Sequence, residues 1–350
     1  MGLKYFGYYF FKYWVSIGLF FYYRSINIVG VERVPKEGPV LFLSNHQNAL
    51  LDILLIATNC KRKPWFLTRA DVFKNTFFRP LFSFLQMLPV YRMRDGKDNL
   101  SKNQLLFATC AGLLRNGESI LVFPEANHSL NRRVRPLSKG FTRIIEAALK
   151  ADPQMQLNIV PIGQNYQMPT QPGDEAALYF GEPIPISYVQ GESLNGMAIK
   201  QEVFEALKKL TTHIEEEHYQ EQLSALHRLG IDFTDPVGVN TKIKEKAFAS
   251  IEKSTQRGQL SARSLFFVWN FPIVLLWRTV LKNRVPEPEF MATFRFGFAL
   301  LVYPLVYLLV FFILSSLYDM QTACLLVVGH AAFNLVLVKM VGITSYHQRI

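Results

Sequence analysis

The sequence contains little cysteine and little charge. Three cysteines occur among 350 residues, and no two of them form a CxxC pair: Cys60, Cys110 and Cys324. An odd number without metal-ligand spacing argues against a disulfide framework and the common zinc motifs, and favours a reducing compartment. Charged residues make up 19% of the chain and hydrophobic residues 50%. Such a chain is expected to bury long stretches in a core or in a membrane.

Acidic residues are also outnumbered. The chain has 38 Lys and Arg against 27 Asp and Glu, a formal net charge of +11. This excess suits either nucleic acid or an anionic membrane surface as a partner. An RNP pattern, paired zinc-finger ligands and a basic helix with heptads are all lacking, so no nucleic-acid partner is expected. Apolar runs near both ends make a phospholipid membrane the expected partner.

The apolar run near the start, residues 5–23, is rich in Tyr and Phe. A signal peptide would have a clean apolar core and a cleavage site of small residues, which Tyr22-Tyr23-Arg24 does not provide. Aromatic side chains are typical of helices that lie at the level of the lipid headgroups. Residues 1–24 are therefore predicted to form a membrane-interface helix.

The C-terminal region, residues 261–350, is predicted to hold two transmembrane helices. Residues 297–317 are uncharged and long enough to cross a hydrocarbon core of roughly 30 Å. Residues 322–338 form the second candidate, in which His330 and Asn334 either pair across helices or mark a lipid path. The alternative for these segments is a buried protein core.

The charges around these segments predict how the protein is oriented. Arg295 precedes the helix pair and Lys339 follows it, whereas the connecting YDMQ has no Lys or Arg. By the positive-inside rule, the central domain lies on the cytoplasmic face of an integral membrane protein. The lack of targeting signals favours the bacterial inner membrane. Residues 265–281 contain Pro272 and Arg278, and they are expected to form a re-entrant or interfacial segment.

The central part, residues 25–190, alternates short apolar strands with helical patterns. This alternation predicts a layered α/β domain with a mostly buried mixed sheet. Residues 191–260 are predicted to form a helical extension, with one long polar helix over 196–228 and another near 240–256. The expected strands are 26–31, 39–45, 64–69, 88–92, 119–125, 158–166 and 177–186, and the expected helices of the domain are 49–59, 71–84, 98–115 and 138–150.

His46 and Asp52 follow one of these strands. Six residues of regular helix turn through about 600°, so the two side chains would point to different sides of a helix. They meet only if His46 lies in the loop after the strand and Asp52 in the first turns of the next helix, which Asn48 would cap. Asp52 would then hold one imidazole nitrogen while the other acts as a general base. A structural role is the alternative for such a pair taken alone.

Three further strands end in a similar way. Arg92 and Arg94 follow one strand and suit phosphate or carboxylate recognition, with a solvated loop as the alternative. Glu125 ends another strand, either as a cap or as an acceptor for a substrate hydroxyl. Pro161 and Gly163 lie near the end of a third. Ligands of α/β sheets bind beyond the carboxyl ends of the strands, so these segments are expected to converge on one site.

Four blocks of the sequence resemble, in order, those of the glycerolipid acyltransferases, the family of lysophosphatidate and glycerol-3-phosphate acyltransferases: SNHQNALLD, VYR, FPEANHS with RPLSKGFTRI, and VPIGQNY. The similarity covers roughly residues 25–190. It implies that His46 is the general base and Asp52 its orienting partner. It also implies the substrate-binding residues: Asn45 of the first block, Arg92 for the acceptor phosphate, Glu125 for the glycerol group, and Lys139 and Gly140 as further phosphate contacts.

Two positions depart from the family pattern. Five residues separate His46 from Asp52, an HX5D spacing, where the family usually has four. The longer spacing resembles that of a branch of glycerol-3-phosphate acyltransferases. The residue after Glu125 is Ala126, where the family usually has glycine. If that position needs a positive φ, the alanine is strained.

The resemblance implies acyl transfer from acyl-CoA or acyl carrier protein to a glycerol hydroxyl of lysophosphatidate or glycerol-3-phosphate, with no cofactor and no metal. Two alternatives stay open. A membrane-anchored lipid or thioester hydrolase would use Ser44 or Ser129, although neither lies in a GxSxG elbow. A non-catalytic membrane adaptor would use the α/β domain as an interaction module. His213 and His218 are expected on a solvated helix and not at a zinc site.

Overall fold

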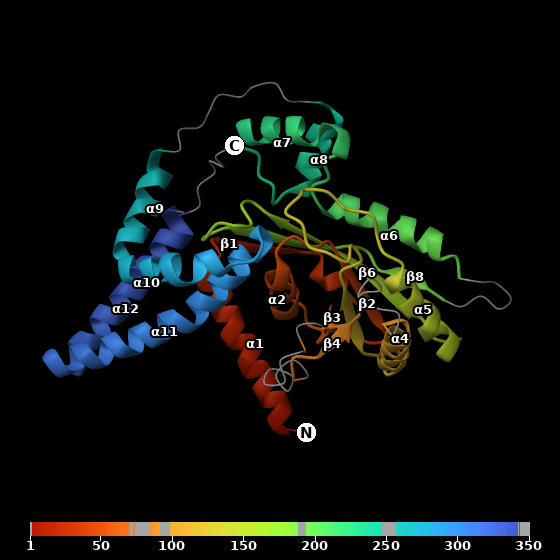
Figure 1. The fold of residues 1–350 in the computed structure, drawn as a ribbon, viewed down its shortest axis with the longest axis horizontal. Helices are drawn as coiled ribbons and strands as arrows, with labels where there is room; N and C mark the ends of the chain where they lie inside the picture. Colours follow the sequence, from red (N-terminus) through yellow and green to blue (C-terminus); the bar gives the residue numbers. More distant parts are fainter. Residues whose placement is uncertain are drawn as a thin grey trace.

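The structure is a computed structural model that describes residues 2–70, 73, 84–91, 99–187, 194–246, 257–341 and 343. A twisted sheet with helices on both faces forms the main body, and the C-terminal helices project from one side of it (Figure 1). The predicted layered α/β class is confirmed.

The sheet is mixed and has eight strands in its described part, in the order β1-β7-β6-β2-β5-β3-β4, with β8 also paired to β6. Strands β7 and β8 run antiparallel to β6, whereas the other neighbours are parallel. The strands are β1 Ser25–Val29, β2 Val40–Ser44, β3 Trp65–Arg69, β4 Met87–Val90, β5 Ser119–Val122, β6 Leu157–Tyr166, β7 Glu175–Phe180 and β8 Ile184–Ile186.

Both faces of the central strands are covered, which explains why these strands are mainly apolar and do not alternate between polar and apolar residues. All five residues of β2 are buried. Helices α1 Gly2–Tyr22 and α2 Ala49–Asn59 pack on one face together with the start of α11. Helices α4 Asn99–Arg115, α5 Gly140–Ala151 and α6 Gly196–Leu210 pack on the other.

Helix α1 has two different faces. Val15 and Leu19 are buried in the same core as β2 and α2. The opposite face is exposed and aromatic: Phe6, Tyr9, Phe10, Tyr13, Phe20 and Phe21. The helix is therefore part of the α/β core on one side, and only its other side is available to a membrane. The division of the chain into four regions at residues 24, 190 and 260 stays a prediction.

The predicted single helix over 196–228 is wrong. The chain leaves α6 at Leu210 and becomes helical again only at η4 Glu216–His218 and α7 Tyr219–Arg228. Asn165 of β6 explains the break, because its carboxamide donates to Leu210 O and accepts from Thr212 N. These bonds hold the backbone in an extended path across the end of β6. His213 is consequently buried, and its Nδ1 accepts from Val134 N, so its predicted solvated position is wrong as well.

Several other boundaries differ from the expectation. The expected strand 177–186 is two strands, β7 and β8, and Pro183 lies between them. In place of the expected helix near 240–256, the described residues contain α8 Pro236–Lys244. Residues 247–256, and almost all of the expected helix 71–84, lie outside the described residues.

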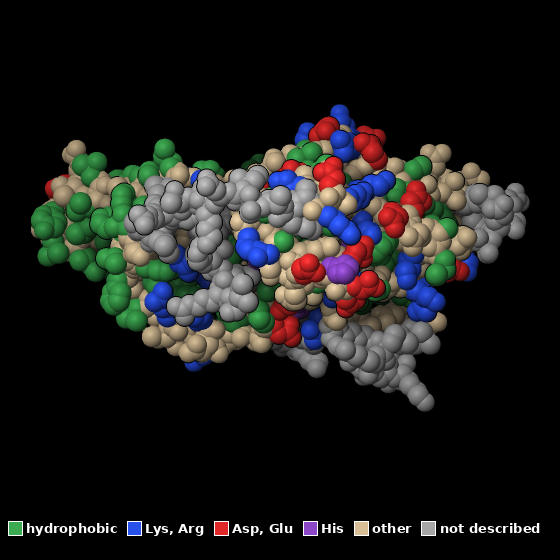
Figure 2. All heavy atoms as spheres, turned by 90° about the horizontal axis from the view of Figure 1, so that it is seen from above, with side chains coloured by type: hydrophobic (Ala, Val, Ile, Leu, Met, Phe, Trp, Pro, Cys, Tyr) green, Lys and Arg blue, Asp and Glu red, His purple; other side chains and the backbone are tan. Residues whose placement is uncertain are grey.

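Two helical stretches of the described chain are long and apolar enough to cross a membrane: Pro288–Leu317, which contains α11 Met291–Leu317, and Met320–Met340, which begins with α12 Met320–Val336. The alternative of a buried core does not hold for α11, because its apolar stretch is not covered by the rest of the protein. Figure 2 shows the hydrophobic side chains gathered at the end of the molecule where these helices lie. Before them, α9 Arg257–Trp269 and α10 Phe271–Leu276 meet at Asn270 with an 88° bend, consistent with a re-entrant segment.

Polar residues join the bent pair to the long helices. Asn270 and Asn334 exchange two side-chain hydrogen bonds, of 2.7 and 3.0 Å. Tyr303 donates to Asn270 Oδ1, and Tyr307 bonds both Asn334 and His330. Of the two possibilities for His330 and Asn334, pairing across helices is thus the one observed. Such bonds fix helix positions where an apolar surrounding offers polar groups no water.

Candidate active site

The predicted meeting of His46 and Asp52 is confirmed. Strand β2 ends at Ser44, His46 lies in the loop that follows, and Asp52 lies in the first turn of α2. The Nδ1 of His46 is 2.7 Å from Asp52 Oδ2. The Asp52 side chain is fully buried, whereas 15% of the His46 side chain is exposed. Among the described residues, Nε2 of His46 has no hydrogen-bond partner, so it is the nitrogen left for a substrate.

The loop itself fixes the carboxylate of Asp52. Its Oδ2 also accepts hydrogen bonds from the backbone N–H groups of Gln47 and Asn48, both at 2.8 Å. Asn48 does occupy the N-cap position of α2, but its side chain makes no capping bond. It donates instead to Pro169 O, so the predicted side-chain cap is wrong. The carboxylate that orients His46 also satisfies the backbone groups that a cap would otherwise serve.

Tyr166 is a functional candidate that the sequence analysis missed. Its hydroxyl donates to Asp52 Oδ1 at 2.5 Å, and both residues are completely buried. Burial, reinforced by the negative charge of Asp52, raises the pKa of Tyr166 well above its usual value. The phenol therefore stays protonated and keeps donating. The only signal in the sequence is a tyrosine at the end of the strand that carries the fourth block.

The loop after β5 closes around the imidazole. The ring of Phe123 stacks on His46 with centroids 3.9 Å apart and an interplanar angle of 14°. The ring of His128 meets His46 edge-on at 5.7 Å. The backbone N–H of Ser129 donates to His46 O. The third block thus contacts the first, as expected from strands that end at the same edge of the sheet.

Glu125 lies beside this ring but is already engaged. Its Oε2 accepts from Nε and Nη2 of Arg135 at 3.1 and 2.8 Å, and Oε1 accepts from the backbone N–H of Arg135. Burial raises the pKa of Glu125, and the adjacent Arg135 guanidinium opposes that shift. This pair fixes the loop between β5 and α5. The contact of Glu125 with a glycerol group stays a prediction.

The remaining described candidates lie at the same edge. The carboxamide of Asn45 is 3% exposed, and it donates to and accepts from the backbone of Gln164. Asn45 thereby joins β2 to β6 beside His46. Lys139 is exposed at the N-cap position of α5, and Gly140 is the first residue of that helix. Free N–H groups at a helix start suit phosphate. Substrate contacts of these three residues stay predictions.

Comparison with known proteins agrees with this geometry. Residues 25–164, which hold the dyad and the strands around it, match the family model described as Acyltransferase. Residues 25–164 are therefore an acyltransferase domain by similarity, and the relatives that they match are glycerolipid acyltransferases.

The acyltransferase domain is similar to two plant proteins. One is the chloroplastic 1-acyl-sn-glycerol-3-phosphate acyltransferase BAT2 of Brassica napus, 29% identical over 49% of this chain and 46% of that protein. The other is the chloroplastic LPAT1 of Arabidopsis thaliana, 30% identical over 49% of this chain and 44% of that protein. The similarity thus spans less than half of each relative. The crystal structure of the LPA acyltransferase PlsC from Thermotoga maritima matches with a TM-score of 0.37 and 18% identity, over 56% of this chain and 72% of that chain.

One departure from the family pattern has the predicted consequence. Ala126 has a φ of 63°, in the left-handed region where glycine is favoured. Its N–H donates to Phe123 O, which closes a tight turn directly after β5. The alanine is therefore strained, as expected from the family's usual glycine. Arg92, predicted to bind the acceptor phosphate in the acyltransferase domain, lies outside the described residues, as does Arg94.

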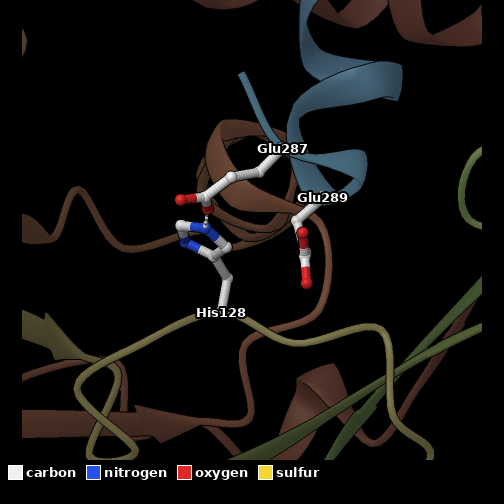
Figure 3. Close-up of side chains that lie close together, drawn as sticks. All are labelled: His128, Glu287 and Glu289. Carbon is white, nitrogen blue, oxygen red and sulfur yellow. Dashed lines mark hydrogen bonds and ion pairs between the residues drawn. The ribbon is translucent and has the colours of Figure 1, made fainter. Parts of the chain in front are cut away.

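The C-terminal region adds a wall to the candidate site. His128 Nε2 is 2.8 Å from Glu287 Oε2, and Phe290 packs edge-on against the His128 ring. Figure 3 shows His128 pointing to Glu287, with Glu289 beside them. The potential ligand atoms of these three residues lie within 4.8 Å of one another, so they could hold a cation. Sequence analysis missed this wall because 159 residues separate His128 from Glu287.

Proposed function

We propose that the protein is a membrane-bound O-acyltransferase of phospholipid synthesis. It transfers a fatty acyl group from acyl-CoA or acyl carrier protein to a glycerol hydroxyl of lysophosphatidate or glycerol-3-phosphate. The observation that carries the proposal is the 2.7 Å contact between His46 Nδ1 and the buried Asp52 carboxylate, with Nε2 left for a substrate. The names of the plant relatives support an acceptor of the acylglycerol-phosphate type.

The reaction is a direct transfer. Nε2 of His46 removes the proton from the acceptor hydroxyl while that oxygen attacks the thioester carbonyl. Asp52 holds the tautomer with the proton on Nδ1 and stabilises the imidazolium that forms. The tetrahedral intermediate then expels the thiolate, which takes the proton back from His46. A general base of this kind contributes about 10²–10⁴-fold in rate. Neither a metal nor a cofactor is required, because a thiolate is a good leaving group.

The acceptor is held from the loops around the dyad. The start of α5, with Lys139 and Gly140, supplies N–H groups and a positive charge for a phosphate. Arg92 and Glu125 hold the phosphate and the glycerol group. A hydroxyl that these contacts misplace loses the rate advantage of proximity.

The membrane supplies the acceptor and takes up the product. Helices α11 and α12 anchor the protein, and the exposed aromatic face of α1 lies in the headgroup region beside them. The acyltransferase domain lies on the cytoplasmic face, in a bacterial inner membrane.

The contacts of the two serines do not favour hydrolysis. Ser44 Oγ donates to Asn45 O, and Ser129 Oγ accepts from Asn131 N. Within the part of the chain that the structure describes, neither hydroxyl is hydrogen-bonded to His46. A serine nucleophile activated by His46 would need such a bond.

The test is acyl transfer by the detergent-purified full chain. Labelled acyl-CoA or acyl carrier protein is offered with lysophosphatidate, glycerol-3-phosphate or lysophosphatidylcholine. We expect transfer to a phosphate-bearing acceptor that falls at least about a hundredfold in His46→Ala. His218→Ala, an exposed histidine of η4, is the matched control and keeps full activity. Folded protein that transfers nothing with any pair, or His46→Ala that keeps its activity, would favour the membrane adaptor instead.

A further inference from the structure

Three arginines converge where the bent helix pair meets the start of α11. Arg263 belongs to α9, Arg278 to the short π-helix η5 Trp277–Leu281 that follows α10, and Arg295 to the first turns of α11. The guanidinium carbons of Arg263 and Arg278 lie 5.3 and 5.0 Å from the centroid of the same ring, Phe267. That of Arg295 lies 5.5 Å from the ring of Trp277. The charges of Arg278 and Arg295 both act on Arg263.

This arginine cluster has no counter-charge within the described part of the chain. None of its three members forms an ion pair there, and the guanidinium of Arg295 donates to a backbone oxygen, Thr170 O. Two arginines of the acyltransferase domain differ in this respect, since Arg33 and Arg135 each pair with a glutamate. Like charges brought together without a partner repel one another. The aromatic rings hold the guanidinium planes in place, and an anion would complete the arrangement.

The position of the cluster in the sequence suits the level of the lipid phosphates. Arg295 is the last charged residue before the uncharged run of α11, and the next is Asp319, after the helix. Trp277 and Phe267 add the aromatic side chains that are typical of the membrane interface. In Figure 1, α9, α10 and the start of α11 lie together on the side of the sheet from which the C-terminal helices project.

The cluster is connected to the dyad through a short series of hydrogen bonds. Arg295 bonds Thr170 O, and the neighbouring Pro169 O accepts from the side chain of Asn48. Thr293, two residues before Arg295, donates to Asn48 O. The backbone N–H of Asn48 in turn donates to Asp52. The start of α11 therefore connects Arg295 to the loop that holds the dyad.

We propose that Arg263, Arg278 and Arg295 form a binding site for the phosphate of a phosphomonoester lipid, the class to which lysophosphatidate and phosphatidate belong. A phosphomonoester carries a charge between −1.5 and −2 near neutral pH, which three guanidinium groups match better than the single charge of a phosphodiester. Planar guanidinium groups also bind phosphate oxygens in pairs. The site rests on the proposed function for its purpose: it holds the anionic lipid as it passes between the bilayer and His46.

A diffuse attraction of basic residues to the membrane surface is the competing hypothesis, and the chain offers a matched control for it. Lys282 and Arg284 follow Arg278 in the same segment and are exposed. They carry the same charge but make none of the ring contacts described above. A specific site would lose lipid affinity only when an arginine of the cluster is replaced, whereas surface attraction would weaken equally when any of these basic residues is replaced.

The experiment measures lipid binding by the full chain in uncharged detergent micelles, which remove the surface potential of a bilayer. Dioleoyl phosphatidate is titrated and the bound lipid is counted by native mass spectrometry. We expect Arg263→Gln and Arg278→Gln each to weaken binding about tenfold, which corresponds to losing one charge-assisted phosphate contact. The double variant Lys282→Gln/Arg284→Gln stays within about twofold of the wild type. Arg278→Lys, which keeps the charge but not the planar fork, falls between the two.

Three other outcomes of this binding experiment would overturn the proposal. Equal losses in the cluster variants and the control double variant would indicate diffuse attraction. Equal affinity for phosphatidylglycerol would remove the preference for a phosphomonoester. Displacement of the lipid by glycerol-3-phosphate or inorganic phosphate at equal concentration would assign the site to a soluble phosphate. Thermal unfolding of every variant verifies that it is folded.

The result is independent of turnover. Binding is an equilibrium measurement, and His46→Ala is expected to bind phosphatidate as the wild type does. If the chain transfers no acyl group but the arginine variants lose phosphatidate, the lipid site stands and the proposed function fails. If transfer depends on His46 but the arginine variants bind normally, the proposed function stands and the lipid site fails.

Discussion

Tyr166→Phe removes one oxygen atom from the support of the dyad and leaves the packing of the ring intact. In the structure, Asp52 Oδ2 accepts three hydrogen bonds, from His46 and from two backbone N–H groups. Oδ1 accepts from the Tyr166 hydroxyl at 2.5 Å. A hydrogen bond to a charged group contributes about 1.5–3 kcal/mol. Without it, the carboxylate is held through Oδ2 alone, and its bond to His46 loses alignment.

The expected effect is on the chemical step. Each 1.36 kcal/mol of lost transition-state stabilisation is about tenfold in rate, so a bond of this strength predicts a fall in kcat of about ten- to a hundredfold. Tyr166 has no exposed surface with which to touch a substrate, so KM for the acyl donor should stay within about twofold. Removing a donor from the carboxylate also makes the dyad easier to protonate. The acidic limb of the pH–rate profile therefore moves to higher pH.

Several titratable groups lie near the dyad. They are Tyr23 and Tyr166 beside Asp52, and Glu125 and His128 beside His46. Tyr23→Phe is the matched control, because Tyr23 is equally buried but its hydroxyl has no hydrogen-bond partner among the described residues. The control should keep the wild-type kcat and pH profile. A Tyr166→Phe enzyme whose kcat and pH profile coincide with those of the wild type would refute the reasoning.

Three further predictions concern stability. Ala126→Gly removes the backbone strain of an alanine at a φ of 63°. The left-handed region costs alanine roughly 1–2 kcal/mol, and the greater chain entropy of unfolded glycine cancels part of that gain. The variant should therefore unfold at a higher temperature. Burial raises the pKa of Asp174 to about 8. Between pH of about 4 and about 8, the folded state therefore keeps a proton that the unfolded state has released. The free energy of unfolding falls as pH rises through this range. Asp174→Asn, which resembles the protonated form, should show a smaller fall in melting temperature over this range. Asn270→Ala breaks the reciprocal bonds with Asn334 and should cost about 0.6–2 kcal/mol in detergent unfolding.

Matched substitutions show what would contradict these expectations. Ala147 lies inside α5, where Ala147→Gly should destabilise the protein by about 1 kcal/mol. If Ala126→Gly also destabilised the protein, the alanine at position 126 would not be strained. Asp152→Asn, at the half-buried end of α5, should keep the pH dependence of the wild type. An Asp174→Asn protein whose melting temperature falls with pH as steeply as the wild type would exclude the buried proton. An unchanged unfolding curve for Asn270→Ala would show that the polar contacts do not hold the helices together.

The local pattern of the sequence predicted much of the framework. Mainly apolar runs of five to ten residues became buried strands, such as β2 and β6, because a strand covered on both faces buries almost all of its side chains. The uncharged run inside α11 predicted a membrane-length helix from its length alone. The dyad could also be predicted, because His46 and Asp52 are close in sequence and a strand–loop–helix order leaves few ways for them to meet.

Errors arose where a distant side chain competed with local preference. The polar pattern of 196–228 favours one helix, but Asn165 binds the backbone at Leu210 and Thr212 and interrupts it. Asn48 is a good capping residue by type, yet the carboxylate of Asp52 already serves the loop. Both outcomes depend on hydrogen bonds whose partners are chosen by packing, and helix propensity does not contain that information.

The sequence by itself determined the α/β class, the membrane-length helices and the pairing of His46 with Asp52, since each follows from periodicity, composition or short spacing. Only the tertiary structure decided what surrounds that pair. Tyr166 reaches Asp52 across 114 residues, and the start of α11 brings Glu287 to His128 and Arg295 to the loop beside the dyad. Such contacts are fixed by how β6 and the C-terminal helices pack against the first block, and no local pattern encodes that packing.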